Sequence, residues 1–149
     1  MTFDSASPML DAAREYAGRG IRVFPVWGIT DSRCDCGAAS CQAGKHPLGA
    51  MVPNGLLNAT TDAETIRAWW TRFPNANIGT PTDWCVVLDV DVRKGGDESL
   101  AALEKANWPG LPETPEVLTG GGGRHYFFTW PAERSIKKRP AKKRRKKKA

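Results

Sequence analysis

Two aspartates separated by one residue, Asp89 and Asp91, lie at the end of an apolar, β-branched run over residues 84–92. A run of this length and composition predicts a buried strand, central in a sheet. Side chains two apart on a strand share a face, so the two carboxylates would project together. Two adjacent like charges favour a cation between them, and oxygen ligands suit Mg²⁺ or Mn²⁺. A strand end in solvent, with both aspartates hydrated, explains the pattern equally well.

Three cysteines and one histidine form a second candidate site, with the spacing C-x-C-x4-C-x4-H: Cys34, Cys36, Cys41 and His46. Thiolates and an imidazole in a segment without a core of its own indicate a closed tetrahedral Zn²⁺ site, whose metal would supply folding energy. A reducing cytoplasmic setting disfavours disulfides between them. Free thiols beside a solvent-facing histidine are the alternative. Cys85, inside the apolar strand, is predicted to be a buried small hydrophobe.

Three basic residues stand close to glycines and are candidates for phosphate contacts. Arg124 and His125 follow four glycines at positions 120–123, which allow a ligand to approach the backbone closely. Lys45 lies between Gly44 and His46. The alternatives are a flexible hairpin turn, a polar residue at a strand start, and a surface lysine.

The first half of the chain predicts two helices around a short strand and a long irregular segment. Ser7 followed by proline predicts a helix N-terminus, and glycines at 18 and 20 end that helix. Residues 21–27 read as a strand whose proline suggests a sheet edge or an irregular exit. Residues 28–58 lack periodicity and are too long for an ordinary loop, so either something orders this segment or it is a functional insertion. A capping box at 61–64 opens a helix that ends at Pro74. Its apolar face comprises Ile66, Trp69, Trp70 and Phe73, and core packing is preferred over base stacking for the tryptophans.

The second half predicts strands at 77–80, 84–92, 116–119 and 125–130, with a helix from Asp97 to near Asn107. Acidic residues in the first turn of this helix favour its dipole. Mixed helices and strands indicate an α/β (α+β) fold.

The positive charge is concentrated at the C-terminal end. Of 22 Lys and Arg, ten lie in residues 137–149 with no acid, which leaves 12 basic and 16 acidic residues, a net charge of −4, for residues 1–136. Such a tail buries nothing, repels itself and would bind any polyanion, so we expect disorder over residues 134–149. A functional basic arm and an accidental read-through product have the same composition. No apolar run reaches membrane-span length and no signal segment is present, so we expect a cytoplasmic protein without a membrane partner.

Together the motifs resemble the bifunctional DNA primase/polymerase (prim-pol) domain of archaeo-eukaryotic primase type, found in phages, plasmids and integrated elements. The resemblance spans about residues 8–131, and its ordered series is more specific than any single motif. The matching segments are residues 12–16, 20–25, the cysteine cluster through 47, 59–62, 69–70, 77–79, 87–91 and 121–128. We therefore predict a prim-pol domain at 6–133, with the zinc insertion at about 30–50.

The resemblance implies an RRM-like catalytic sheet that performs template-directed nucleotidyl transfer in DNA replication. Asp89 and Asp91 would bind catalytic Mg²⁺ or Mn²⁺ in a two-metal displacement. His125 would contact the triphosphate of the incoming nucleotide, with Arg124 and Lys45 as further nucleotide-binding candidates. The zinc element would help hold single-stranded DNA, and a replicative helicase is an expected partner.

The sequence departs from the family pattern after the histidine strand. Family members continue into strands that supply a third acidic metal ligand. In this sequence the only acid after His125 is Glu133, and the residues around it do not match the family pattern. We expect a C-terminal truncation that impairs polymerase activity. The alternatives are a non-catalytic nucleic-acid-binding remnant and a metal-dependent nuclease.

Overall fold

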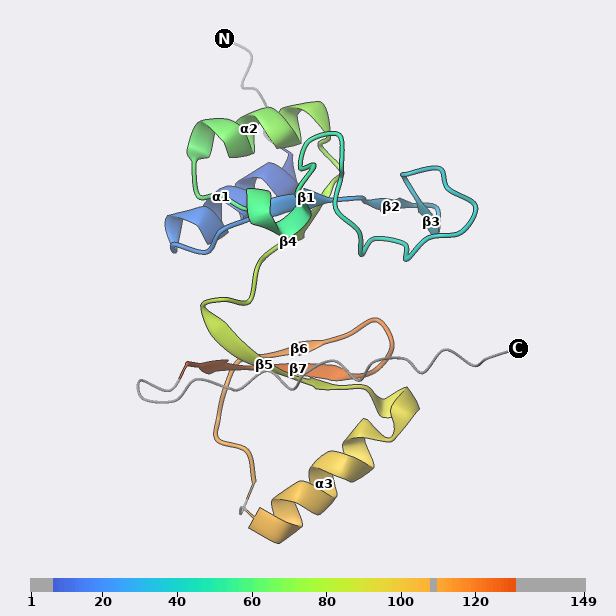
Figure 1. The fold of residues 1–149 in the computed structure, drawn as a ribbon, viewed down its shortest axis with the longest axis vertical. Helices are drawn as coiled ribbons and strands as arrows, with labels where there is room; N and C mark the ends of the chain where they lie inside the picture. The colour runs from blue at the N-terminus through green and yellow to red at the C-terminus, as the bar shows by residue number, and fades with distance from the viewer. Residues whose placement is uncertain (1–6, 108–109, 131–149) are drawn as a thin grey trace, which may run out of the picture. The chain divides into compact units, whose positions relative to one another are not determined.

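The computed structural model describes residues 7–107 and 110–130, and the predicted basic tail lies outside them. The chain divides into two compact units, Met1–Trp84 and Cys85–Ala149. Three α-helices, two short 3₁₀ helices and seven strands are present in the described residues, which confirms the predicted α+β class (Figure 1). None of the helices in these two ranges has the length and apolarity to cross a membrane.

The N-terminal unit is built on two helices, α1 (Pro8–Gly18) and α2 (Ala63–Arg72), which pack against each other and against a pair of strands (Figure 1). The predicted start of α1 is confirmed. The hydroxyl of Ser7 accepts a hydrogen bond from the N–H of Leu10 at 3.2 Å, and Pro8 occupies the first turn. This cap satisfies one of the amide groups that a helix N-terminus leaves without a partner.

Helix α2 begins one residue later than the predicted capping box implies. Asp62, rather than Thr61, caps the helix, and its carboxylate accepts a hydrogen bond from the N–H of Thr65 at 2.8 Å. Glu64 does not reach back to the cap but pairs with Arg67 at 2.6 Å. Aspartate competes well with threonine for the cap because its charge also interacts with the helix dipole. The core role predicted for the tryptophans is confirmed, since Trp70 is 1% exposed and Trp69 8%.

Replacing Asp62 with alanine is expected to lower the stability of the N-terminal unit near neutral pH. The hydrogen bonds from Thr65 lower the pKa of Asp62 below its ordinary value. A carboxyl group with a depressed folded-state pKa adds stability above its unfolded pKa and loses it as the pH falls through the folded pKa. The gap between wild type and Asp62→Ala in urea denaturation should therefore shrink on acidification toward pH ~3. Asp11, in the first turn of α1, provides a comparison variant whose effect should stay small. A gap that stays constant with pH would contradict the role assigned to the charged cap.

The strand pair beneath these helices consists of β1 (Phe24–Val26) and β4 (Asn77–Gly79), which are antiparallel. The predicted strand at 21–27 is thus shorter than expected. Pro25 lacks an N–H, and in the described residues β4 is the only strand paired with β1. The other side of β1 is not a free edge, because Val26 bridges to Pro47 and the Pro25 carbonyl accepts a hydrogen bond from the N–H of Leu48. Gly79 lies across from Phe24, where a Cβ would come within 2.6 Å of the phenyl ring. Glycine at this position lets the ring fold over the neighbouring strand.

The core of this unit includes residues from the segment that we interpreted as lacking a core. Leu48 and Val52 are each 1% exposed and join Val23, Ile66 and Trp70 in one cluster. Before them the segment forms a small hairpin of β2 (Ile29–Thr30) and β3 (Arg33–Cys34), and after them η1 (Gly55–Asn58). These two residues belong to the shared core of the unit, so the segment still has no core of its own. Their role could not be read from the sequence, because two isolated apolar residues produce no periodicity.

The C-terminal unit contains β5 (Cys85–Val90), η2 (Val92–Lys94), α3 (Gly96–Asn107), β6 (Glu116–Leu118) and β7 (Arg124–Thr129). The strand order is β5-β7-β6, and β7 is antiparallel to both neighbours. β5 and β6 are therefore parallel, so β5, α3 and β6 form a split β-α-β unit of the kind found in ferredoxin-like folds. In the described residues β5 lies at an edge, and β7 takes the central place that we had predicted for β5. Strand composition reports burial better than order in a sheet, because order depends on distant segments.

Candidate functional site

The four predicted zinc ligands lie together in the N-terminal unit. The ligand atoms of Cys34, Cys36, Cys41 and His46 are all within 4.8 Å of one another. Cys34 Sγ lies 3.3 Å from His46 Nε2, and Cys36 Sγ lies 3.6 Å from Cys41 Sγ. A tetrahedral Zn²⁺ with ordinary bond lengths separates two sulfurs by about 3.8 Å and a sulfur from a nitrogen by about 3.5 Å. The donor set and its spacing thus fit a metal such as zinc.

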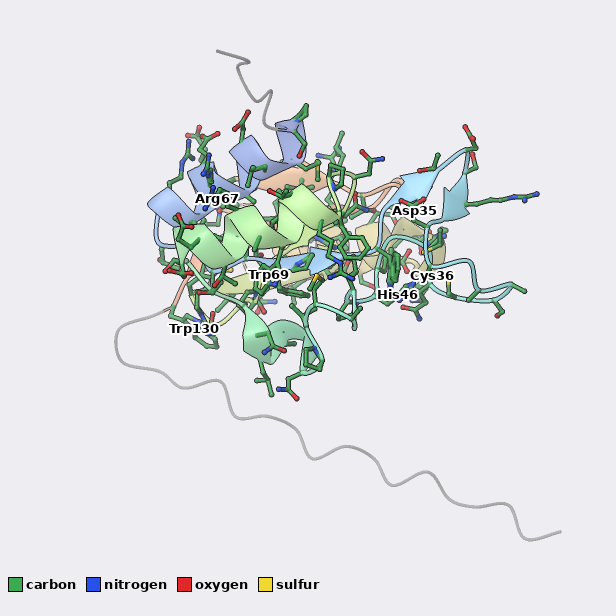
Figure 2. The ribbon with its side chains drawn as sticks, turned by 90° about the horizontal axis from the view of Figure 1, so that it is seen from above. Asp35, Cys36, His46, Arg67, Trp69 and Trp130 are labelled. Carbon is green, nitrogen blue, oxygen red and sulfur yellow. The ribbon has the colours of Figure 1, made fainter. Side chains whose placement is uncertain are left out.

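The local chain conformation explains how these ligands converge. Asp31 and Ser32, with φ of 49° and 63°, form the two-residue turn between β2 and β3, a conformation that suits tight hairpins. The hairpin carries Cys34. The other end of the segment is fixed by a hydrogen bond from the N–H of Trp27 to the carbonyl of His46, at 3.1 Å. Figure 2 shows Cys36 and His46 close together beside this hairpin.

Two of the thiols have strongly shifted pKa values in opposite directions. Backbone N–H groups of Cys36 and Gly44 lower the pKa of the Cys34 thiol to about 6. The hydrogen bond with Cys36 and the nearby Cys34 sulfur raise the pKa of the Cys41 thiol to about 11. Crowded sulfurs resist carrying several negative charges at once. A divalent cation removes this conflict, so metal binding and loss of the remaining thiol protons should be coupled.

The candidate site in the C-terminal unit brings Asp89 and His125 together across two strands. Asp89 on β5 is paired in register with His125 on β7, and residues directly opposite in an antiparallel pair share a face. His125 Nε2 lies 3.4 Å from an Asp89 carboxylate oxygen. The Asp89 side chain is 68% exposed and that of His125 38% exposed, so both remain accessible to a ligand.

Asp91 lies just beyond the end of β5 and caps η2. Its backbone stays extended, with φ −90° and ψ 100°, so strand alternation continues from Asp89 to Asp91. The Asp91 carboxylate accepts a hydrogen bond from the N–H of Arg93 at 3.1 Å and pairs with Lys94 Nζ at 3.0 Å. Lys94, and then the Arg93 amide and the two basic charges, lower the pKa of Asp91. The carboxylate is therefore charged and faces cations already.

The two other predicted nucleotide contacts lie elsewhere. Arg124 is adjacent to His125 on a regular strand, so its side chain points to the opposite face of the sheet. There it pairs with Glu116 at 3.2 Å, and that carboxylate raises the pKa of the arginine. Lys45 is exposed and belongs to the N-terminal unit, next to His46 of the Cys₃His group.

Close backbone contacts hold the loops at the Asp91 end of the sheet. A Cβ on Gly123 would lie 2.4 Å from the carbonyl oxygen of Val90, and one on Gly96 would lie 2.8 Å from the backbone of Asp91. Both glycines therefore let a neighbouring segment approach the main chain. Of the four glycines at 120–123, only Gly123 meets backbone in this way, and Gly122 adopts a φ of 81°.

Several residues of these sites escaped the sequence analysis. Arg93 and Lys94 follow Asp91 directly, and a basic pair beside an acidic motif is a signal that could have been used. Gly96 was not singled out. Trp27 and Phe73, whose ring centroids are 6.2 Å apart, line a cavity near the cysteine cluster. Nothing in their spacing indicates that contact.

The fold and the two sites define an α+β protein with a Cys₃His group that could hold a metal ion and a carboxylate–histidine pair on an antiparallel sheet. The N-terminal domain model of the bifunctional DNA primase/polymerase (Prim-Pol) matches residues 13–147. The chain belongs to this family, which confirms the predicted resemblance and supports a DNA primase/polymerase-type function in replication. Such a function involves nucleic acid and nucleotides. No curated protein and no solved structure was found to match the chain.

Proposed function

We propose that the chain carries out template-directed nucleotidyl transfer at the sheet face that holds Asp89 and His125. The observation that carries this proposal is their cross-strand pairing at 3.4 Å, with Asp91 following on the same strand. A carboxylate beside a histidine at an exposed position can serve a charged substrate such as a nucleoside triphosphate. Family membership makes DNA synthesis the reaction class to test first.

The donor set at this site fits Mg²⁺ or Mn²⁺. Asp89 and Asp91 offer hard carboxylate oxygens, and the lowered pKa of Asp91 keeps its group charged. When bound there, such ions would lower the pKa of the attacking 3′-hydroxyl and neutralise charge on the leaving pyrophosphate. In the described residues the two aspartates and His125 do not form a close group of three ligand atoms. Ligand binding would therefore have to draw Asp91 away from Lys94.

The remaining steps fall to the side chains of this unit. The Asp89 carboxylate, 3.4 Å from His125 Nε2, would hold the imidazole ring in place for contact with the triphosphate. Arg93 and Lys94, on η2, are exposed and place positive charge beside Asp91, where phosphate oxygens would be received. Arg124 would contribute from the other face only by supporting β6 through Glu116.

The proposal also covers the wider setting of the protein. We infer a phage, plasmid or integrated element as its context, single-stranded DNA as the template, and a replicative helicase as a partner. These inferences rest on the family resemblance. The metal centre would help hold template or primer, because the cysteine segment belongs to the same domain match.

Replacing Asp89 with asparagine is expected to abolish nucleotide incorporation. Labelled nucleotides, Mn²⁺ and a primed single-stranded template would be incubated with the full chain in excess over DNA, since turnover with two carboxylates is expected to be slow. Asparagine keeps the size of the side chain but removes the charge, so incorporation should fall at least about a hundredfold. Asp97→Asn, an exposed acid in the first turn of α3, is the matched control and should retain activity.

Other outcomes point to other functions. DNA breakdown without nucleotide addition, lost in Asp89→Asn, would replace the proposal with a metal-dependent nuclease. DNA binding without either reaction, unchanged by Asp89→Asn, would indicate a non-catalytic nucleic-acid-binding protein.

A further inference from the structure

A small cavity with aromatic walls lies in the N-terminal unit, between the metal-binding segment and the end of α2. Its volume is about 180 Å³, and its lining includes Trp27, Gly28, Asp35, Arg72, Phe73 and Asn75. Pockets for drug-sized ligands occupy roughly 300–1,000 Å³. This cavity therefore suits one planar ring system rather than a whole cofactor.

The walls of the cavity are formed by two aromatic side chains that lie far apart in the sequence. Trp27 and Phe73 meet edge to face, with ring centroids 6.2 Å apart and planes at 76°. Both side chains pack against the core of the unit and remain partly exposed. The segment after Phe73 is held by a hydrogen bond from Trp70 Nε1 to the carbonyl of Ala76, at 2.9 Å. The Phe73 side of the cavity is thus held in place by contacts within the unit.

Close contacts at Gly28 form the floor. A Cβ at this position would lie 2.4 Å from the carbonyl oxygen of Asn75 and 2.6 Å from a carboxylate oxygen of Asp35. Glycine therefore lets the Asp35 carboxylate and the Asn75 main chain approach the same point. In the part of the chain that the structure describes, the Asp35 carboxylate has no hydrogen bond or ion pair of its own. It is left to accept a hydrogen bond from a ligand.

The rim adds a cation and a link to the metal centre. The Arg72 guanidinium carbon lies 5.8 Å from the centroid of the Phe73 ring. Trp27 contacts the ring of His46 at 6.4 Å between centroids, and Asp35 stands between the ligands Cys34 and Cys36. Figure 2 places Asp35 next to Cys36 and His46. The metal-binding segment therefore shapes one wall of the cavity.

We propose that this cavity binds a single unpaired nucleobase of single-stranded DNA, one that carries an exocyclic amino group. Aromatic faces accept any base by stacking, and Arg72 can add a cation–π contact or meet the adjacent phosphate. The ionised Asp35 carboxylate accepts hydrogen bonds and donates none. The amino groups of cytosine, adenine and guanine donate hydrogen bonds. Thymine offers two carbonyl oxygens and a single ring N–H, so it fits less well. The inference rests on the proposed function for the choice of DNA as the ligand.

The test measures the binding of labelled single-stranded oligonucleotides of equal length by fluorescence anisotropy. The three probes are an oligocytidine, an oligothymidine and an abasic strand, each bound by the full metal-loaded chain at moderate salt. The salt weakens base-independent attraction of phosphates to basic residues. Wild type should bind the cytosine strand about tenfold more tightly than the abasic strand, and more tightly than the thymine strand.

Two variants assign this preference to the cavity. Asp35→Asn should remove most of the preference for cytosine over thymine, and Phe73→Leu should bring all three affinities together. Arg67→Gln, on α2, is a control outside the cavity and far from Asp35 in Figure 2. It should change all three affinities by the same factor. Metal content should be equal in all proteins. If Phe73→Leu unfolds, Asp35→Asn still tests the proposal, because Asp35 is exposed and its replacement should not unfold the chain.

The proposal would be overturned if wild type bound the cytosine strand and the abasic strand with equal affinity. It would also be overturned if both variants kept the wild-type preference for cytosine. The Asp89→Asn variant separates the two proposals. If Asp89→Asn loses nucleotide incorporation but wild type shows no base preference, the proposed function stands without the base site. If incorporation is absent from wild type but the preference depends on Asp35, the base site stands alone.

Discussion

Transferring the wild-type chain into a strong chelator is expected to remove one zinc ion per chain and to unfold the segment between Trp27 and Leu48. The four ligand atoms lie within 4.8 Å of one another, and without a cation their thiolates oppose each other. Structural zinc contributes on the order of 10 kcal/mol to folding in small zinc domains. Part of that should appear here, because Leu48 follows the ligand His46 closely and belongs to the core. We expect the midpoint of thermal unfolding to fall by ~10 °C or more. Metal analysis, circular dichroism and limited proteolysis within residues 28–58 would report the change.

Two cysteine variants make this experiment specific. Cys41→Ser removes one ligand, whereas Cys85→Ala alters a buried cysteine of β5 outside the cluster. Titration with Co²⁺, which reports tetrahedral thiolate ligation by its colour, should give a strong band in wild type and Cys85→Ala. Cys41→Ser should show a weaker, shifted band and lower affinity. Equal spectra and metal contents in all three proteins would rule out the Cys₃His site.

Gly123→Ala is expected to reduce nucleotidyl transfer by about two orders of magnitude. The new methyl group would lie 2.4 Å from the Val90 carbonyl oxygen, and a backbone atom cannot rotate aside as a side chain can. The turn would move away from the end of β5, and with it the start of β7 that carries His125. A displacement of about 1 Å at a reacting group can lower the rate a hundredfold. The measurement is the same incorporation assay, at saturating Mn²⁺.

Gly120→Ala is the control for this prediction. Gly120 belongs to the same turn, yet a Cβ there would meet nothing within 4 Å. Its activity and thermal stability should match wild type. Equal activity in the two variants would show that the position of the turn relative to β5 does not matter for the reaction.

Local signals predicted the helices and most strands of this chain well. Ser7 and Pro8 specify the start of α1, and the acids at positions 97 and 98 lie in the first turn of α3, as expected. Such signals act within a few residues and survive folding unchanged. The choice of Asp62 over Thr61 as a cap is a competition between adjacent residues, which the pattern alone does not decide. The edge position of β5 depends on β7, which lies far along the chain, and therefore lay beyond local reasoning.

In the candidate sites too, features set by neighbouring residues could be predicted and those set by distant segments could not. The cysteine cluster was predicted from spacing, because ligands within one short segment have little freedom to separate. The pairing of Asp89 with His125 required the register of two distant strands, and no local pattern supplies it. The separation of Arg124 from His125 could have been predicted, since neighbours on any strand point to opposite faces. The contact between Trp27 and Phe73 depends on how the segment after α2 returns toward β1, which only the packed unit determines.

The position of His46 has a consequence for the order of folding events. The next residue, Pro47, bridges to Val26, and the N–H of Leu48 donates to the carbonyl of Pro25 at 3.0 Å. If Cys34 and His46 bind a metal early in folding, they would close the intervening loop and shorten the effective separation between β1 and Leu48 along the chain. Loop closure that is already complete lowers the entropic barrier to the later pairing. Metal present during synthesis or refolding would thus accelerate folding of the N-terminal unit, in addition to stabilising the folded state.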